Sequence, residues 1–101
     1  CVLPADDVRR RFTATVLEPV RDFAEVWFRQ RDSIRFHDPL AAACIFQPDL
    51  CGYRDGFVHV SLAEPTAGWT VFEPRDTDAP HAAACEVDPD RFFEHYFGVV
   101  N

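Results

Sequence analysis

Residues 36–46 read FHDPLAAACIF, an apolar run that opens with an ionisable pair, His37 and Asp38. We expect a helix here with Asp38 as its N-cap, because an Asp carboxylate accepts the free backbone N–H groups of a first turn. Pro39 then falls at the first helical position, where its missing N–H costs nothing. The rest of the run is too apolar for a surface helix, which predicts burial against a sheet. A His beside a carboxylate at the edge of a buried helix is well placed for chemistry, although a plain Asp-Pro cap beside a polar His is the commoner arrangement.

The length and composition of the chain are those of one small globular domain. It has 101 residues, of which 48% are hydrophobic and ten are Phe, enough to build a single core. No apolar run approaches the roughly 20 residues of a membrane span, and no secretory signal pattern opens the chain, so we expect no membrane partner. Because the chain contains no Met, we expect it to be cut from a longer protein.

The charge balance excludes one class of partner. The formal net charge is -7, and all ten basic residues are Arg. An acidic chain lacks the basic stripe that neutralises phosphates, so we expect no nucleic-acid surface. The one basic cluster, Arg9-Arg10-Arg11, has no aromatic residues within it and is balanced by Asp6 and Asp7, which favours a solvated face.

The cysteines give no sign of a disulfide framework. Cys1, Cys44, Cys51 and Cys85 form no C-x-x-C pair. Cys44 and Cys85 lie in apolar runs, where a thiol behaves as a small hydrophobe. We therefore expect all four to be reduced and the protein to be cytoplasmic. A zinc site built on Cys51, His59 and a distant partner lacks the ligand spacing typical of such sites.

The N-terminal half predicts a strand end, an irregular segment and one amphipathic helix. Cys1-Val2-Leu3 is typical of the end of a strand, and the polar segment from Asp6 to Thr15 is predicted to be irregular. A helix is predicted from about Pro19 to Arg31, because apolar residues recur on one face at helical spacing. These residues are Val16, Val20, Phe23, Ala24, Trp27 and Phe28. We expect this stripe to belong to the core rather than to a ligand site.

The C-terminal half predicts a loop followed by short strands. Gln47-Pro48 ends the preceding helix, because a residue before proline avoids the helical region. The segment from Asp49 to Gly56 is rich in breakers and is predicted to be a loop. Strands are predicted at residues 57–62, 69–73 and 82–87, the first two forming a hairpin around a turn at 66–68.

The chain closes with a second Asp-Pro cap pattern. Asp88 precedes Pro89, and a last helix is predicted from Arg91 to Val99. Its buried residues should be Phe92, Phe93, Tyr96 and Phe97. Two helices, a small antiparallel hairpin sheet and a closing C-terminal helix make the fold class α/β or α+β.

Four segments together resemble a known family. The run His37-Asp38-Pro39-Leu40-Ala41-Ala42-Ala43 closely resembles the His-Asp-Pro-Leu-Ala-x-Ala signature of the nucleoside hydrolases, the inosine-uridine-preferring family. Three further segments follow in the family's order and spacing: Pro48-Asp49-Leu50, Thr66-x-Gly68-x-Thr70 and Val87-Asp88-Pro89-Asp90-Arg91-Phe92-Phe93. Upstream, Asp7-Val8 resembles the family's Asp-Val-Thr segment, with Arg9 in place of Thr. The likeness covers nearly the whole chain from Cys1.

The resemblance implies that residues 1–101 are the C-terminal part of a single nucleoside hydrolase domain, an α/β fold that is longer than this chain and has a mostly parallel sheet. The family's N-terminal Asp cluster, D-x-D-x-x-x-D-D, supplies most of the calcium ligands and the general base. That cluster is absent here, and Asp6-Asp7 does not replace it. We therefore expect the isolated chain to be inactive.

The resemblance also implies an activity for the full-length parent. That activity is hydrolysis of the N-glycosidic bond of a ribonucleoside, giving ribose and a free base for purine or pyrimidine salvage. Asp38 matches the family's late Ca²⁺ ligand, and carboxylate oxygens suit this hard cation. His37 matches the active-site His near the leaving base, to which it would donate a proton. The parent would bind Ca²⁺ as its cofactor and form a homo-oligomer.

Two other functions remain open on the sequence. In the first, the chain is a non-catalytic interaction or structural module that kept the hydrolase fold. In the second, it is a metal-binding module using His37, Asp38 and a cysteine. No ligand spacing supports the metal-binding module. We expect no catalytic role for His59, His81 or His95, because nothing in the sequence pairs them with another functional group.

Overall fold

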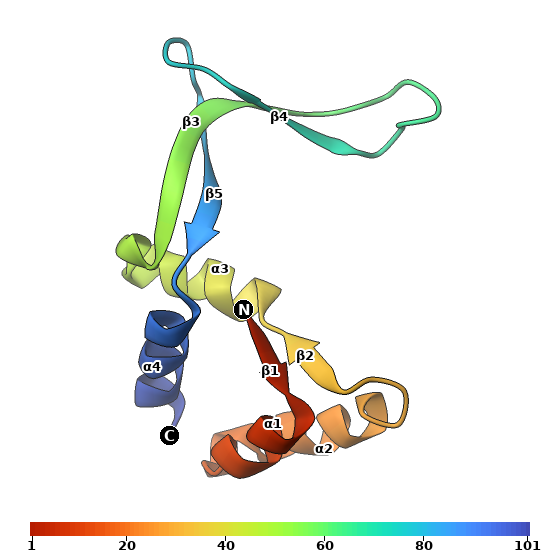
Figure 1. The fold of residues 1–101 in the computed structure, drawn as a ribbon, viewed down its shortest axis with the longest axis vertical. Helices are drawn as coiled ribbons and strands as arrows, with labels where there is room; N and C mark the ends of the chain where they lie inside the picture. The colour runs from red at the N-terminus through yellow and green to blue at the C-terminus, as the bar shows by residue number, and fades with distance from the viewer. The chain divides into compact units, whose positions relative to one another are not determined.

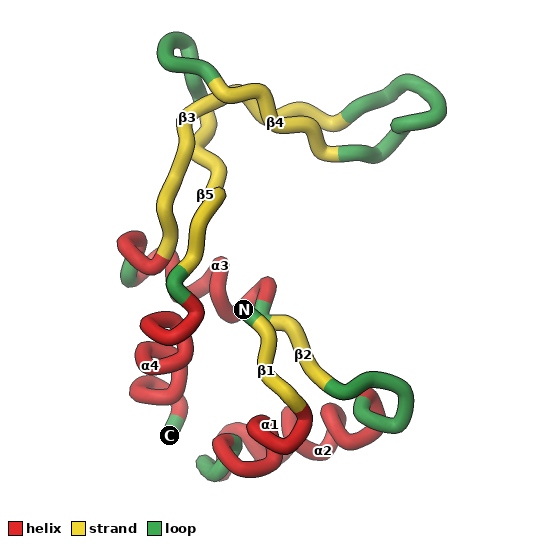
Figure 2. Tube along the Cα trace, in the orientation of Figure 1, coloured by secondary structure: helices red, strands yellow, loops and turns green.

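A computed structural model describes residues 1–101, which form two compact units. The first, called here the helical unit, comprises Cys1–Leu50 and Asp88–Asn101, and the second, the hairpin unit, comprises Cys51–Val87. Figure 1 labels the helices and strands of both units, and Figure 2 colours the same trace by secondary structure. The chain mixes helices with small antiparallel sheets and ends in a helix, which confirms the coarse fold class.

The helical unit contains four helices and two short strands. In chain order these are β1 (Val2–Pro4), α1 (Ala5–Arg11), α2 (Glu18–Trp27), β2 (Ser33–Arg35), α3 (His37–Phe46) and α4 (Pro89–Val100), with 3-10 turns at Thr15–Leu17 and Pro48–Leu50. β1 and β2 pair antiparallel, with Leu3 opposite Ile34. The strand expected at the start of the chain is therefore present.

Aromatic side chains dominate the core of the helical unit. Phe12, Phe92 and Val8 are the largest fully buried side chains. The rings of Phe12 and Phe97 meet edge to face, with their centroids 5.9 Å apart. Burial of one such side chain stabilises a fold by roughly 1.5–3 kcal/mol, and an edge-to-face aromatic pair adds to that. The core thus joins the N-terminal segment directly to α4.

The closing helix α4 has the cap that the sequence predicts. The Asp88 carboxylate accepts hydrogen bonds from the backbone N–H groups of Asp90 and Arg91, each at 3.1 Å, and Pro89 is the first helical residue. At the other end, the Asn101 side-chain amide donates to the backbone oxygen of Arg11 at 3.1 Å. The helix is longer than predicted by two residues at its start and one at its end, because the Asp88 cap and the Asn101 contact hold its two ends.

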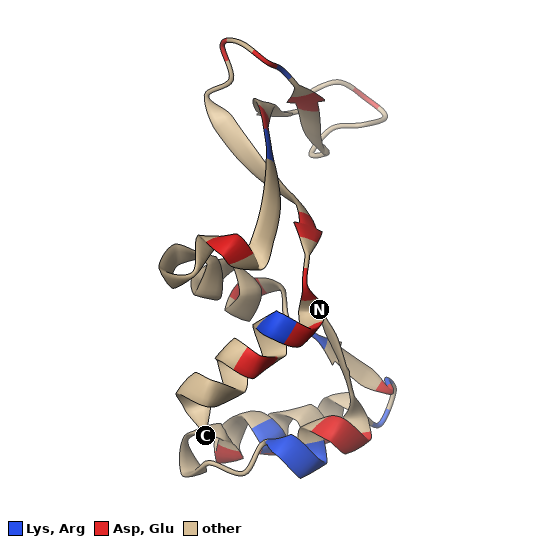
Figure 3. Cartoon of the chain, turned by 60° about the vertical axis from the view of Figure 1, so that its left-hand side comes forward, with Lys and Arg blue, Asp and Glu red and all other residues tan.

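The prediction of an irregular segment from Asp6 to Thr15 is wrong, because α1 occupies most of it. Its first turn carries Asp6 and Asp7 and its last turn three Arg residues, a charge order that complements the helix dipole (Figure 3). Arg9 pairs with Asp6 at 2.9 Å and Arg10 pairs with Asp7, both across one turn. Val8, the one buried residue of α1, has no exposed surface, which anchors the helix in the core.

The helix expected at Pro19–Arg31 is present as α2 but ends at Trp27. Its apolar stripe is largely exposed, contrary to expectation: Phe23 keeps 77% of its surface and Trp27 53%. The reason lies on the polar face, where Arg9 of α1 holds Glu25 through two hydrogen bonds of 2.7 and 2.9 Å. Because this contact turns the polar face toward α1, most of the stripe points to solvent.

The hairpin unit is a three-stranded antiparallel sheet. Its strands are β3 (Cys51–Val60), β4 (Thr70–Pro74) and β5 (His81–Val87), in the order β4-β3-β5. The three strands expected in this region are present, and β3 and β4 form the expected hairpin. The loop predicted from Asp49 to Gly56 is wrong, because pairing with β5 extends β3 back to Cys51. Ladder hydrogen bonds thus override the breaker composition of this segment.

Two glycines of the hairpin unit have positional roles. A Cβ on Gly56 would overlap the backbone oxygen of Glu73 and the ring of Phe72, so only glycine fits there. Gly68 has φ +88° in the turn between β3 and β4, a conformation that L side chains rarely adopt. The backbone N–H of Gly68 donates to the Ser61 oxygen at 2.8 Å. The turn predicted at residues 66–68 is therefore confirmed.

Candidate functional site

The candidate site lies at the start of α3, and a buried phenylalanine positions it. Phe36 directly precedes His37 and is only 3% exposed. Its ring contacts Phe92, Phe93 and Tyr96 of α4, with centroid distances of 5.9, 5.2 and 5.3 Å. These contacts fix the residue from which α3 begins.

The backbone around Phe36 is held as well. Its N–H donates to the Cys1 oxygen at 3.0 Å, which continues the β1–β2 pairing beyond Arg35. Its carbonyl oxygen accepts from the Leu40 N–H at 3.3 Å, the first hydrogen bond of α3. One residue therefore ends the strand ladder and begins the helix, which leaves little freedom for the backbone of His37.

His37 and Asp38 are both exposed and adjacent on the first turn of α3. The expectation that Asp38 caps this helix is wrong: the N-cap is Phe36, and no side chain caps the first turn. Because His37 is already helical, Asp38 and Pro39 fall at the second and third helical positions. The Asp38 carboxylate still lies at the positive end of the helix dipole. Its oxygens have no protein hydrogen bond, so they are available to a ligand.

Most of α3 is exposed, although the sequence predicts a buried helix. Ala43 is its one buried residue, while Ile45 and Phe46 are 77% and 82% exposed. The only sheet of the helical unit is the two-stranded pair of β1 and β2, and it leaves these side chains of α3 exposed. The predicted end of the helix is confirmed, since α3 ends at Phe46 and Gln47 is its C-cap.

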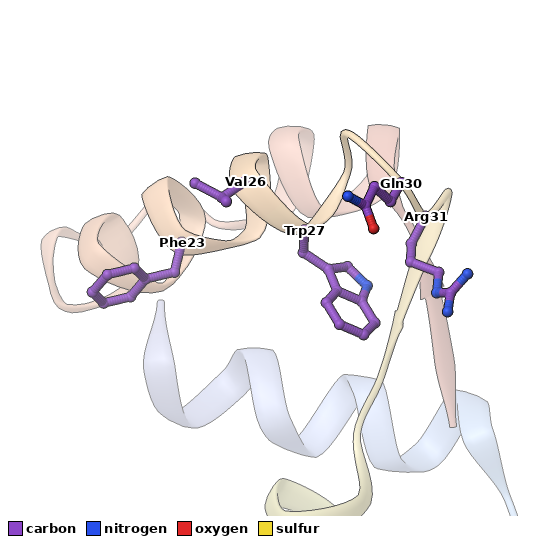
Figure 4. A pocket seen from close by; sticks show the side chains of 5 residues that line it. All are labelled: Phe23, Val26, Trp27, Gln30 and Arg31. Carbon is purple, nitrogen blue, oxygen red and sulfur yellow. The ribbon is translucent and has the colours of Figure 1, made fainter.

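A pocket of about 700 Å³ adjoins His37. Its lining residues are Trp27, Arg31, Asp32, Ser33, Ile34, Arg35 and His37. A second hollow of about 430 Å³ shares Trp27 and Arg31 and continues along α2 to Phe23 (Figure 4). The sequence does not predict this site, because Trp27 is expected in the core and no function is expected for Arg31 or Arg35. The available signal was the pair of arginines four residues apart, directly after an aromatic helix end.

The residues present do not build a calcium site by themselves. Ca²⁺ takes six to eight oxygen ligands, and Asp38 offers one carboxylate. No group of three or more His, Cys, Asp or Glu residues is placed to hold a metal ion. A calcium ion at Asp38 would need further ligands from outside this chain.

The remaining histidines do not line the pocket of His37. His59 and His81 are in the hairpin unit, where the Nδ1 atom of His81 accepts from the Val58 N–H at 3.0 Å. The Nδ1 atom of His59 lies 3.8 Å from Glu73 and has no hydrogen bond. His95 lines a small hollow with Arg91 on α4. None of the three shares the pocket of His37.

Two of the resembling segments, Pro48-Asp49-Leu50 and Val87–Phe93, contact each other through Asp49 and Arg91, which both belong to the helical unit. The Arg91 guanidinium donates to the Asp49 carboxylate at 2.7 Å and to the Asp49 backbone oxygen at 3.1 Å. This hydrogen bond, with the charge of Arg91, holds the pKa of the Asp49 carboxyl below its usual range. The contact links the end of α3 to the start of α4, so it supports the scaffold rather than the pocket.

The comparisons with known proteins assign no family. No protein-family model matches the chain, and no curated protein matches it. None of its helices has the length and apolar character needed to cross a membrane.

Proposed function

We propose that this chain is the C-terminal part of a ribonucleoside hydrolase and contributes His37 and Asp38 to its active site. The observation that carries the proposal is the geometry at the start of α3. Two exposed ionisable residues stand side by side there, fixed by the buried Phe36 and bordered by a pocket of about 700 Å³. Pockets of that size accommodate small-molecule ligands. The proposal otherwise rests on the sequence resemblance.

In the proposed reaction, water attacks C1′ of the ribose and the C1′–N bond breaks. The hydroxyl group stays on the sugar, the second proton of the water goes to the general base outside residues 1–101, and the electron pair of the broken bond goes to the base nitrogen. His37 would donate a proton to that departing base, which avoids release of a bare anion. An imidazole suits this role because it gains and loses a proton near neutral pH.

Asp38 would be one ligand of a calcium ion in the complete protein. Its exposed carboxylate, without an internal hydrogen bond, is compatible with that role. The remaining ligands and the general base would come from an Asp cluster outside residues 1–101. We propose, on the same basis, a cytoplasmic homo-oligomer that acts in nucleoside salvage.

The exposed apolar surface of the helical unit supports a role within a larger domain. Large hydrophobic side chains stay exposed on α2 and α3: Val20, Phe23, Val26, Trp27, Ile45 and Phe46. Large exposed apolar patches usually mark surfaces that pack against another element or partner. The second candidate function, a non-catalytic interaction module derived from the hydrolase fold, draws on the same surface.

Two experiments separate these functions. If the chain is part of a hydrolase, the coding region upstream of Cys1 should contain an in-frame D-x-D-x-x-x-D-D run. If the chain is a self-standing module, a start codon should lie just before Cys1. In the complete protein, His37→Ala should lower the rate of ribonucleoside hydrolysis by about 100-fold or more, the usual contribution of a general acid. His95→Ala, a matched change on α4, should leave the rate near that of the native protein. Equal rates for the two variants would refute the role of His37.

A further inference from the structure

The pocket beside His37 has an unusual charge for this chain. The protein carries a formal net charge of -7, yet two arginines, Arg31 and Arg35, line this one pocket with a single acidic residue, Asp32. Neither arginine takes part in an ion pair. Of the other arginines in the helical unit, Arg9, Arg10 and Arg91 each hold a carboxylate within 2.9 Å. The remaining three, Arg11, Arg21 and Arg29, form no ion pair. Both arginines of the pocket therefore lack a carboxylate partner, even though Asp32 lines the pocket as well.

The same pocket has a flat aromatic wall of fixed orientation. The Trp27 indole N–H donates to the backbone oxygen of Ser33 at 3.0 Å, which holds the ring against the start of β2. The guanidinium of Arg31 lies 5.8 Å from the centre of the Trp27 ring, so cation and ring adjoin. Trp27 remains 53% exposed, which leaves ring surface for a ligand (Figure 4). An exposed indole is a good stacking surface for planar heterocycles.

These two features select one ligand chemistry. A guanidinium binds planar carboxylates and similar anions through paired N–H donors, and an indole binds flat rings. We propose that the pocket binds a planar heterocyclic anion, with its ring on Trp27 and its acidic group on Arg31 and Arg35. If the proposed function holds, on which this second step rests, the ligand is the base of the substrate, because His37 lines the same pocket. The substrate class would then be ribonucleosides with an acidic base.

The test compares two ligands that differ by one acidic group. Orotate and uracil share the same ring, but only orotate carries a carboxylate, and inorganic phosphate supplies an anion without a ring. Each is titrated into the ¹⁵N-labelled 101-residue chain and followed by NMR. Orotate should shift the Trp27 indole N–H signal and the Nε–H signals of Arg31 and Arg35. The Trp69 indole, in the hairpin unit, is the internal control and should not move.

The chain should bind orotate at least about tenfold more tightly than uracil, because one charge-assisted hydrogen bond contributes a free energy of that size. The double variant Arg31→Gln/Arg35→Gln should lose that advantage. Arg29→Gln, which removes an exposed arginine outside the pocket, should keep it within about twofold. Trp27→Leu should weaken the binding of orotate and of uracil to the same extent, since it removes the stacking surface.

Three results would overturn the proposal. The first is equal binding, or none, of orotate and uracil. The second is phosphate binding as tight as that of orotate, which would make the arginines a general anion patch. The third is full orotate binding by the double arginine variant. Because binding is read on the chain itself, these results do not depend on hydrolysis, and orotidine compared with uridine in the complete protein tests the substrate class separately.

Discussion

The ring of Phe36 meets the ring of Phe93 edge to face, with the centroids 5.2 Å apart and the planes at 85°. Phe36 is the last residue before the proposed catalytic pair, and Phe93 belongs to the helix that closes the chain. The contact therefore couples the C-terminal helix to the position of His37. A substitution in α4 that disturbs Phe93 should reach the candidate site through Phe36.

We expect Phe36→Ala to destabilise the 101-residue chain by about 3–5 kcal/mol, because it leaves a cavity among four aromatic rings. Urea denaturation followed by far-UV circular dichroism measures the change. Phe23→Ala is the matched control, since Phe23 is 77% exposed and its loss should cost about 0.5 kcal/mol or less. Equal losses for the two variants would mean that Phe36 is not the anchor of α3.

The two Asp-Pro pairs of the chain should respond differently to truncation. Asp88→Ala removes two hydrogen bonds to the first turn of α4 and should cost about 1 kcal/mol. Asp38→Ala removes only a charge near a helix start and should cost about 0.5 kcal/mol or less. Thermal unfolding of both variants measures the difference. A cost for Asp38→Ala as large as that for Asp88→Ala would show that Asp38 caps α3 after all.

These two pairs also mark what the sequence could and could not predict. The pattern correctly predicts the cap at Asp88, whose backbone is extended, with φ -96° and ψ 101°. The same pattern fails at Asp38 because Phe36, buried and hydrogen-bonded to Cys1, already starts the helix. A local pattern indicates which residue is able to cap a helix, while long-range contacts decide where the helix begins.

Two glycines should give stability changes of opposite sign. Gly56→Ala should destabilise the chain by about 1–3 kcal/mol, because the new methyl group would overlap the Glu73 backbone and the Phe72 ring. Gly98→Ala should stabilise it by roughly 0.5–1 kcal/mol, since Gly98 lies in α4 with open space around the added carbon. Chemical denaturation of both variants tests the register of β3 against β4. A neutral Gly56→Ala would contradict that register.

Removal of Arg91 should raise the pKa of Asp49. The hydrogen bond and charge of Arg91 lower this pKa in the folded chain. The contribution of the pair to stability is therefore present above the ordinary carboxyl range and is lost as the pH falls through the lowered pKa. Titration of the Asp49 carboxyl carbon by ¹³C NMR should give a higher pKa in Arg91→Gln than in the native chain. Arg29→Gln should leave it unchanged, and an unchanged value in Arg91→Gln would rule out the contact.

The pocket and the exposed stripe of α2 show a second limit of sequence interpretation. Helical spacing correctly places Phe23 and Trp27 on one apolar face. It does not reveal whether anything covers that face, which here depends on the contact between Arg9 and Glu25. The position of Arg31 and Arg35 in a pocket could not be predicted for a similar reason. They line it only because the chain turns after α2 and returns as β2.

The most direct measurement of the central claim is ribose release from a ribonucleoside by the complete protein that carries this chain, with calcium present. The native protein should release ribose, and Asp38→Ala should lower the rate by about 100-fold or more, as loss of a metal ligand does. Asp76→Ala, an exposed loop residue of the hairpin unit, should keep nearly the native rate. No ribose release by the native protein, or an Asp38→Ala rate equal to that of Asp76→Ala, would contradict a role for this chain in nucleoside hydrolysis.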